Sequence, residues 1–217
     1  MSRPHKAEDF TDQITEDRNW RIKEISDLDS AIKRGDKESR EVLLRAHVVM
    51  CYAHWEGYVK FSARKYLEFV SLLDLNYREL DKQFFRNNFL QKLANFYTTK
   101  PNIDKSCNFI NEILDSPDCK FSRIDGNLIN TKSNLNSNVL GDICTVCGLP
   151  KNIFNQWLTF IDLLVNRRNK IAHGEQILID MDELDKNSNK TIEIIRIFGV
   201  ELEKCVANET YKTNWII

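Results

Sequence analysis

One segment of the sequence combines the residue types that phosphate chemistry uses. It is Arg167-Arg168-Asn169-Lys170-Ile171-Ala172-His173-Gly174, at the end of an otherwise apolar helical pattern. The planar guanidinium of arginine matches a phosphate group, and an imidazole exchanges protons near neutral pH. Arg168 is therefore a candidate phosphate ligand, and His173 is a candidate general acid–base. Asn169 lies one helical turn before His173, where an amide can fix the orientation and tautomer of the imidazole ring.

The residues before this segment predict that Arg168 lies on a buried helix face. An apolar stripe recurs at spacings of three and four residues: Phe154, Trp157, Ile161 and Leu164. Arg168 takes the next position on this stripe. A buried charge is costly unless something pairs with it. Either a carboxylate of a neighbouring helix pairs with Arg168, or its guanidinium reaches water, or it binds a phosphate.

A straight helix does not aim Arg168 and His173 at the same point. The step of five positions from Arg168 to His173 turns about 140° at ~3.6 residues per turn. Either Arg168 curls round the helix, or the site combines residues of two chains. The second alternative predicts a two-fold homodimer in which the helix ends face each other.

Other charged residues are candidates for supporting roles. Glu56 follows Trp55 on a largely apolar helix, so it either adds a carboxylate to the site or forms an ordinary surface ion pair. Arg167 and Lys170 flank the motif and are candidate RNA-binding residues. A further basic cluster is either a solvated face or a surface that tracks RNA: Lys60, Arg64 and Lys65.

Two groups of residues have the types that metal sites use. The first lies on one face of a predicted helix: His47, Cys51 and His54. The second combines a lone CxxC pair with two distant cysteines: Cys144, Cys147, Cys107 and Cys119. The first group has no evident fourth ligand, and the spacing of the second fits no common zinc knuckle. Core or hydrogen-bonding roles are therefore favoured, and we predict no metal and no cofactor.

Helical periodicity dominates the chain and predicts an all-α protein. The helices are expected at about residues 11–34, 37–73, 77–97, 105–114, 137–147, 151–173 and 191–208. Residues 1–10 are expected to be a disordered tail, and residues 115–150 an irregular insert or one with a hairpin at Asp125-Gly126. Gly174 is the expected C′ residue of the motif helix. We predict one up-and-down helical bundle over residues 1–217.

Aromatic residues complete this fold prediction. Three tryptophans in helical apolar patterns are expected in the core: Trp20, Trp55 and Trp157. The apolar end of the chain, Trp215-Ile216-Ile217, is expected to dock on the body or to contact a partner.

The overall composition limits the kind of protein. A chain of 217 residues with 42% hydrophobic content can bury one sizeable core. The net charge of -1 excludes a globally basic nucleic-acid binder, so any RNA affinity must come from a local basic patch. No apolar run is long enough to cross a bilayer, and the N-terminus has no signal-peptide core. We expect a cytoplasmic protein without membrane contact, whose six cysteines are thiols.

The segment Arg168-Asn169-Lys170-Ile171-Ala172-His173 resembles the motif of the HEPN superfamily. The chain looks like a prokaryotic HEPN protein of the MAE-like branch. A softer similarity covers Ala53-His54-Trp55-Glu56-Gly57-Tyr58-Val59-Lys60, and Trp20-Arg21 also fits.

The resemblance implies a helical bundle that dimerises to form a composite cleft and cleaves RNA without metal. The ribose 2′-OH attacks its own phosphate and leaves a 2′,3′-cyclic phosphate and a 5′-OH. His173 is then the acid or base, Arg168 stabilises the phosphorane, and Asn169 orients the site. Such an RNase is expected to be a toxin or effector of a toxin–antitoxin or phage-defence system, with a cognate antitoxin or sensor as partner. The alternative is a non-catalytic HEPN-like module that binds a partner protein or a nucleotide.

Overall fold

The computed structural model describes residues 3–99, 101–121 and 128–213, except for the side chains of residues 91, 94 and 95. All the named elements in this part of the chain are helices, which confirms the all-α prediction. The α-helices are α1 (Ala7–Arg34), α2 (Lys37–Leu72), α3 (Lys82–Thr98), α4 (Ile103–Asp115), α5 (Ser137–Val146), α6 (Leu158–Ala172) and α7 (Met181–Ala207). The short 3-10 helices are η1 (Tyr77–Glu79), η2 (Ser116–Asp118) and η4 (Lys151–Phe154).

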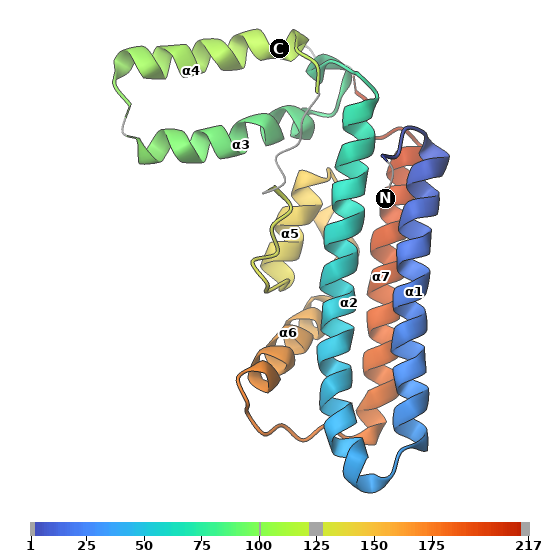
Figure 1. Cartoon of the computed structure of the whole chain (residues 1–217). Coiled ribbons are helices and arrows are strands. Elements are labelled where there is room, and N and C mark those ends of the chain that lie inside the picture. The colour runs from blue at the N-terminus through green and yellow to red at the C-terminus, as the bar shows by residue number, and fades with distance from the viewer. Residues whose placement is uncertain (1–2, 100, 122–127, 214–217) are drawn as a thin grey trace.

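Three long helices form the body of the molecule. Helices α1, α2 and α7 lie side by side, with α1 antiparallel to the other two (Figure 1). The Asp36 side chain caps α2 by accepting a hydrogen bond of 2.7 Å from the Ser39 amide. Trp55 of α2 is fully buried and its ring packs against those of Phe154 and Phe198. This aromatic contact joins α2 to α7 and to the segment that precedes α6.

The remaining helices lie on one side of this body. Helices α5 and α6 flank α2, whereas α3 and α4 project away as a separate arm (Figure 1). Because α6 runs outward from α2, its C-terminal end, which carries the motif, is turned away from the bundle. The fold therefore presents the motif at the periphery.

The boundaries of several predicted segments differ in the structure, among them that of α3, which begins at Lys82 after the separate helix η1. Helix α1 begins at Ala7, within the expected tail, because Phe10 is fully buried against aromatic rings of α2. Helix α7 begins ten residues earlier than predicted, at Met181. Its first turns carry buried polar residues such as Ser188, which periodicity of apolar residues does not detect. The predicted motif helix is interrupted between η4 and α6, and only α6 is α-helical.

Two expectations fall on residues outside the described part of the chain. The turn Asp125-Gly126 of the expected hairpin lies there, and so does Trp215-Ile216-Ile217. The described end of the insert, residues 128–136, is irregular and leads into α5. In the ranges that the structure describes, no helix has both the length and the apolar composition that crossing a membrane requires.

Candidate active site

Arg168 lies where α6 packs against α2. Its guanidinium carbon is 4.3 Å from the centroid of the Tyr52 ring. The same group donates hydrogen bonds to Asn169 Oδ1 (2.7 Å) and to the Ser133 carbonyl (3.1 Å). Its Nη2 lies 4.0 Å from Glu56 Oε2, and the side chain is 23% exposed. The charge on the apolar stripe is therefore held by an aromatic face, two hydrogen bonds and a nearby carboxylate, with one edge open to solvent.

Glu56 is part of this site through a second set of contacts. The Thr131 hydroxyl donates to Glu56 Oε1, and Thr131 is fully buried. The Tyr52 hydroxyl accepts a hydrogen bond of 2.8 Å from the Leu135 amide. Burial raises the pKa of Tyr52 to about 12, so the phenol is neutral at physiological pH. Glu56 is thus the one acidic side chain within 4.0 Å of Arg168 in the described part of the chain.

The loop that covers Arg168 has an unusual backbone. Lys132 and Ser133 both have positive φ angles, of 51° and 52°. Residues with a Cβ rarely adopt this conformation, which costs about 1–3 kcal/mol unless the surroundings enforce it. Here Thr131 and Leu135 are anchored on α2 at the two ends of the turn. The anchored turn brings the Ser133 carbonyl to the guanidinium of Arg168.

Sequence reasoning missed the contribution of this loop and of Tyr52. The loop belongs to the segment interpreted as an irregular insert, and nothing in its local pattern places it against α2. For Tyr52 there was a usable pattern, because it lies one turn before Glu56 and so shares its helix face.

The side chain of Asn169 contacts Arg168 and Asn134. Its Oδ1 accepts from Arg168, and its Nδ2 lies 3.4 Å from Asn134 Oδ1. The backbone links Asn169 to His173, because the His173 amide donates to the Asn169 carbonyl (3.0 Å). In the described part of the chain no hydrogen bond joins the Asn169 amide to the His173 imidazole, and the orienting role of Asn169 stays a prediction. Asn169 supports the guanidinium.

His173 is exposed at the end of α6. It is the C-cap residue, and Gly174 follows with a φ of 80°, as expected for a C′ glycine. The Gly174 amide donates to the Ile171 carbonyl (3.0 Å), which ends the helix. Arg168 contacts Tyr52 of α2, whereas His173 is exposed, and in the described part of the chain no hydrogen bond joins the two side chains.

The flanking basic residues differ in their availability. Arg167 forms an ion pair of 2.6 Å with Glu183 at the start of α7. Lys170 is exposed. In the second basic cluster, Arg64 is exposed and Lys65 pairs with Glu68 at 2.9 Å.

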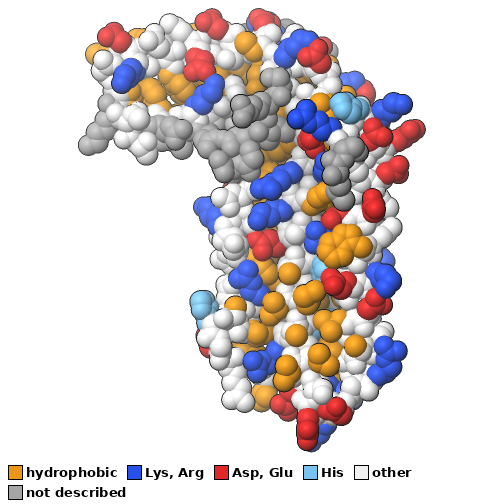
Figure 2. Space-filling view, in the orientation of Figure 1, with side chains coloured by type: hydrophobic (Ala, Val, Ile, Leu, Met, Phe, Trp, Pro, Cys, Tyr) orange, Lys and Arg blue, Asp and Glu red, His pale blue; other side chains and the backbone are white. Residues whose placement is uncertain are grey.

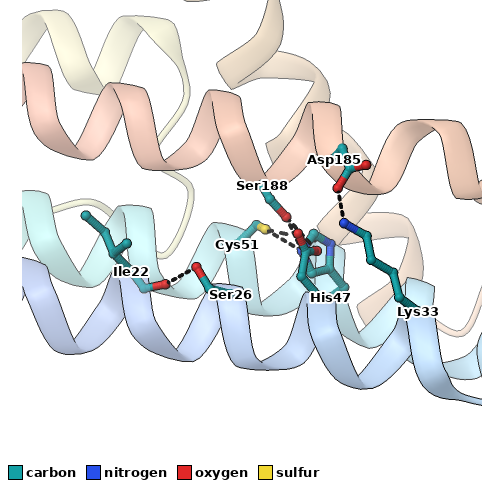
Figure 3. Close-up of polar contacts among 8 residues, drawn as sticks. Ile22, Ser26, Lys33, His47, Cys51, Asp185 and Ser188 are labelled. Carbon is teal, nitrogen blue, oxygen red and sulfur yellow. Dashed lines mark hydrogen bonds and ion pairs between the residues drawn. The ribbon is translucent and has the colours of Figure 1, made fainter.

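His47 and Cys51 belong to a buried polar cluster between α1, α2 and α7 (Figure 3). His47 Nε2 lies 2.8 Å from Ser188 Oγ and 3.4 Å from Cys51 Sγ. Ser188 in turn donates to Asp29 at 2.8 Å. Burial lowers the pKa of His47, with Asp29 acting in the opposite direction, and burial raises the pKa of the Cys51 thiol to about 12. A neutral imidazole and a protonated thiol fit a structural hydrogen-bonding cluster.

His54, the third residue considered with His47 and Cys51 as a possible metal ligand, contacts other residues. His54 Nε2 lies 2.8 Å from Glu24 Oε2, and its ring meets the edge of Trp20. Trp20 was expected in the core but is 46% exposed, because it lies on the outer side of α1 with its indole N–H bonded to Asp17. In the described ranges, no three His, Cys, Asp or Glu side chains are arranged to hold a metal ion.

The cysteines do not form the four-thiolate arrangement. Cys144 and Cys147 are buried, whereas Cys107 and Cys119 are exposed. Burial raises the pKa of Cys144 to about 12. Burial also raises the pKa of Cys147, so these two buried thiols are protonated at neutral pH, unlike thiolate ligands.

The segment of softer similarity in α2, residues 53–60, contains a glycine that packs closely against Arg21 of α1. Arg21 bonds Asp17 through two hydrogen bonds of 2.6 Å and 3.2 Å, and both side chains are largely buried. A Cβ atom at Gly57 would lie only 2.5 Å from Arg21 Nη1. Gly57 therefore lets the Arg21–Asp17 pair fit between α1 and α2.

Comparison with known proteins identifies one family. The model of the family described as RiboL-PSP-HEPN matches residues 16–204, which includes both the motif and the softer similarity. The match confirms the HEPN resemblance and does not confirm the MAE-like branch. No curated protein and no solved structure gives a significant match.

Proposed function

The chain belongs to the RiboL-PSP-HEPN family, and from this premise we propose that it is a metal-independent endoribonuclease. In this proposal the ribose 2′-OH attacks the adjacent phosphorus, and the bond from phosphorus to the 5′ oxygen breaks. One proton leaves the 2′-OH and one is delivered to the 5′ oxygen. The products end in a 2′,3′-cyclic phosphate and a 5′-OH. His173 serves as the acid or the base, and Arg168 stabilises the negative charge of the phosphorane.

The observation that carries this proposal is the arrangement at the end of α6. An arginine is pre-positioned by Tyr52 and Asn169 with an open edge, and a solvent-accessible histidine follows at the helix terminus. Because positions 168 and 173 lie about 140° apart around a helix, we infer a homodimer in which His173 of one chain approaches Arg168 of the other. Lys170, which is exposed, is then free to contact RNA phosphates.

The biological setting is also part of the proposal. An RNase that acts on cellular RNA needs restraint, so we propose a toxin or effector of a bacterial toxin–antitoxin or phage-defence system. It acts in the cytoplasm and is controlled by a cognate antitoxin or sensor protein.

The test is cleavage of a mixed cellular RNA pool in the presence of EDTA. Wild type is compared with His173→Ala, Arg168→Ala and the control His5→Ala, which removes another exposed histidine. We expect cleavage by wild type and His5→Ala, with 2′,3′-cyclic phosphate ends, and loss of cleavage in the other two variants. Undiminished cleavage by His173→Ala would refute the assigned site, and cleavage lost in EDTA would refute metal independence.

One observation favours the non-catalytic alternative. Arg168 already stacks on Tyr52 and bonds the Ser133 carbonyl, which are contacts that a purely structural arginine also makes. In that case Arg168→Ala lowers stability, and neither variant changes RNA or the toxicity of the expressed protein. Toxicity that His173→Ala relieves without loss of stability favours the nuclease.

A further inference from the structure

The arm formed by α3 and α4 is a helical hairpin held together by a few side chains. The rings of Phe96 and Phe109 stack with centroids 4.8 Å apart, and Phe89 meets Phe109 at 6.1 Å. Lys92 forms an ion pair with Glu112 across the same seam. No described side chain of α4 is buried, so this helix is covered on one side only. The arm extends from the body into solvent (Figure 1).

The arm carries two stripes of exposed apolar residues at helical spacing. The stripe on α3 is Leu90, Leu93 and Tyr97, and the stripe on α4 is Ile103, Cys107, Ile110 and Leu114. Ile103 is 81% exposed and Tyr97 73% exposed. The side of the arm that Figure 2 shows carries charged as well as hydrophobic side chains. A monomeric protein seldom exposes such a concentration of large apolar side chains without a partner for it.

Helical geometry places both stripes on the same face of the arm. The two helices meet at a seam formed by Phe89 and Phe96 of α3 and Phe109 of α4. Around α3 the stripe lies about 90° from this seam, and around α4 it lies about 130° from it. Both angles are measured in the sense in which the helix turns from its N-terminus to its C-terminus. The seams face each other and the helices run antiparallel (Figure 1). When two facing helices run antiparallel, a rotation of the same sense around each of them points to the same side of the pair. Both stripes therefore lie on one side, and the arm has one continuous apolar face.

The two helices of the arm carry opposite charges, and this favours a second copy of the arm as its partner. Within its bounds α3 has no acidic residue and three basic ones: Lys82, Arg86 and Lys92. In contrast, α4 has one basic residue and three acidic ones: Asp104, Glu112 and Asp115. Lys92 and Glu112 already pair within the hairpin. The remaining charges still make α3 basic and α4 acidic, so a second copy of the arm, turned over, offers an acidic helix to the basic one and a basic helix to the acidic one.

We propose that the arm is a homotypic association element in which the apolar faces of two copies pack together, with α3 of each chain over α4 of the other. The two-fold axis runs along the arm, and the four helices form an antiparallel bundle. This inference does not depend on RNase activity.

The proposal also fixes how the two arms are aligned along their length. A two-fold axis parallel to the helices keeps each residue at its own height along the arm. The Phe96–Phe109 and Lys92–Glu112 contacts place Tyr97 level with Cys107 in the hairpin. In the association Tyr97 of one chain is therefore beside Cys107 of the other, whereas the two copies of Cys107 lie diagonally apart.

The first test is the mass of the full chain in solution by light scattering over a range of concentrations. Wild type is compared with Ile110→Glu and with Leu178→Glu, a matched control that places the same charge at an exposed apolar position outside the arm. We expect Ile110→Glu to show half the mass of the other two, with an unchanged circular dichroism spectrum. Equal masses for wild type and Ile110→Glu would overturn the proposal. A dimer made through the α6 ends adds to the mass of every variant, so the arm contact is also tested by cross-linking, which detects it directly.

The second test is disulfide cross-linking. The parent protein is Cys119→Ser, which removes the other exposed thiol. Adding Tyr97→Cys is expected to produce covalent dimers under mild oxidation, and adding Cys107→Ser to that variant is expected to abolish them. Covalent dimers in the parent itself indicate that α4 packs on α4, and no dimers in any variant indicates that the arms do not meet. Either result contradicts the proposed pairing.

Discussion

Gly199 in α7 tests whether helix propensity or packing decides the effect of an added methyl group. A Cβ atom at Gly199 would lie 2.1 Å from the Tyr58 hydroxyl oxygen and 3.0 Å from Arg18 Nη1. Ordinary van der Waals contact begins at 3.4 Å, so the fully buried Tyr58 would have to move by well over an ångström. This displacement separates α2 from α7.

The two effects of Gly199→Ala have opposite signs. Alanine favours the helix over glycine by about 0.8–1.0 kcal/mol. Overpacking a filled core costs about 1–3 kcal/mol, and a contact of 2.1 Å with a rigid ring belongs at the upper end. The net expectation is a loss of about 2 kcal/mol of unfolding free energy. For a chain of this size the corresponding fall in melting temperature is about 4–8 °C.

Urea denaturation followed by circular dichroism measures this change, with Gly141→Ala as the control. Gly141 is also helical, and a Cβ atom there meets nothing within 4 Å, so the control is expected to gain up to about 1 kcal/mol. Tyr58→Phe removes the hydroxyl group that the new methyl group would contact, so it should restore part of the lost stability. The double variant Gly199→Ala with Tyr58→Phe is therefore expected to be more stable than Gly199→Ala alone. A Gly199→Ala variant that is as stable as Gly141→Ala would refute the reasoning.

Arg168→Ala is expected to lower the free energy of unfolding by about 1–2 kcal/mol, because it removes an aromatic stack and two hydrogen bonds. Because His173 is exposed, His173→Ala should change the free energy of unfolding by less than about 0.5 kcal/mol in the same urea titration. Equal losses of stability in the two variants would contradict a packed Arg168 and an exposed His173. Burial lowers the pKa of His47, so below about pH 6.5 the unfolded chain binds more protons than the folded one. Stability should therefore fall as pH drops through that value, and the urea midpoint of His47→Gln should depend less on pH; an equal dependence argues against this cause. Lys170→Ala should weaken RNA binding and reduce its salt slope by about 1, whereas Arg167→Ala should leave the slope unchanged because Glu183 already holds that guanidinium. Gel shifts at several salt concentrations distinguish the two, and equal slopes for both variants would contradict this assignment.

The sequence by itself determined the helices and the candidate residues on them. Periodicity of apolar residues depends on neighbours three and four positions apart, which is information local to each segment. It therefore predicted α2 to within one residue and α5 equally well, and the glycine that ends α6. The same local information placed Arg168 on the apolar stripe and left open whether its side chain curls round the helix or two chains share the site.

Only the tertiary structure decided what surrounds those residues. The turn at Ser133 reaches Arg168 across 35 positions of sequence, and its conformation is enforced by anchors on α2. The burial of Ser188 and the exposure of Trp20 likewise depend on which helix lies opposite, because a polar residue can be buried where a distant chain segment supplies its hydrogen bonds. Long-range contacts of this kind leave no period in the sequence, and so the environment of the site could be obtained only from the folded chain.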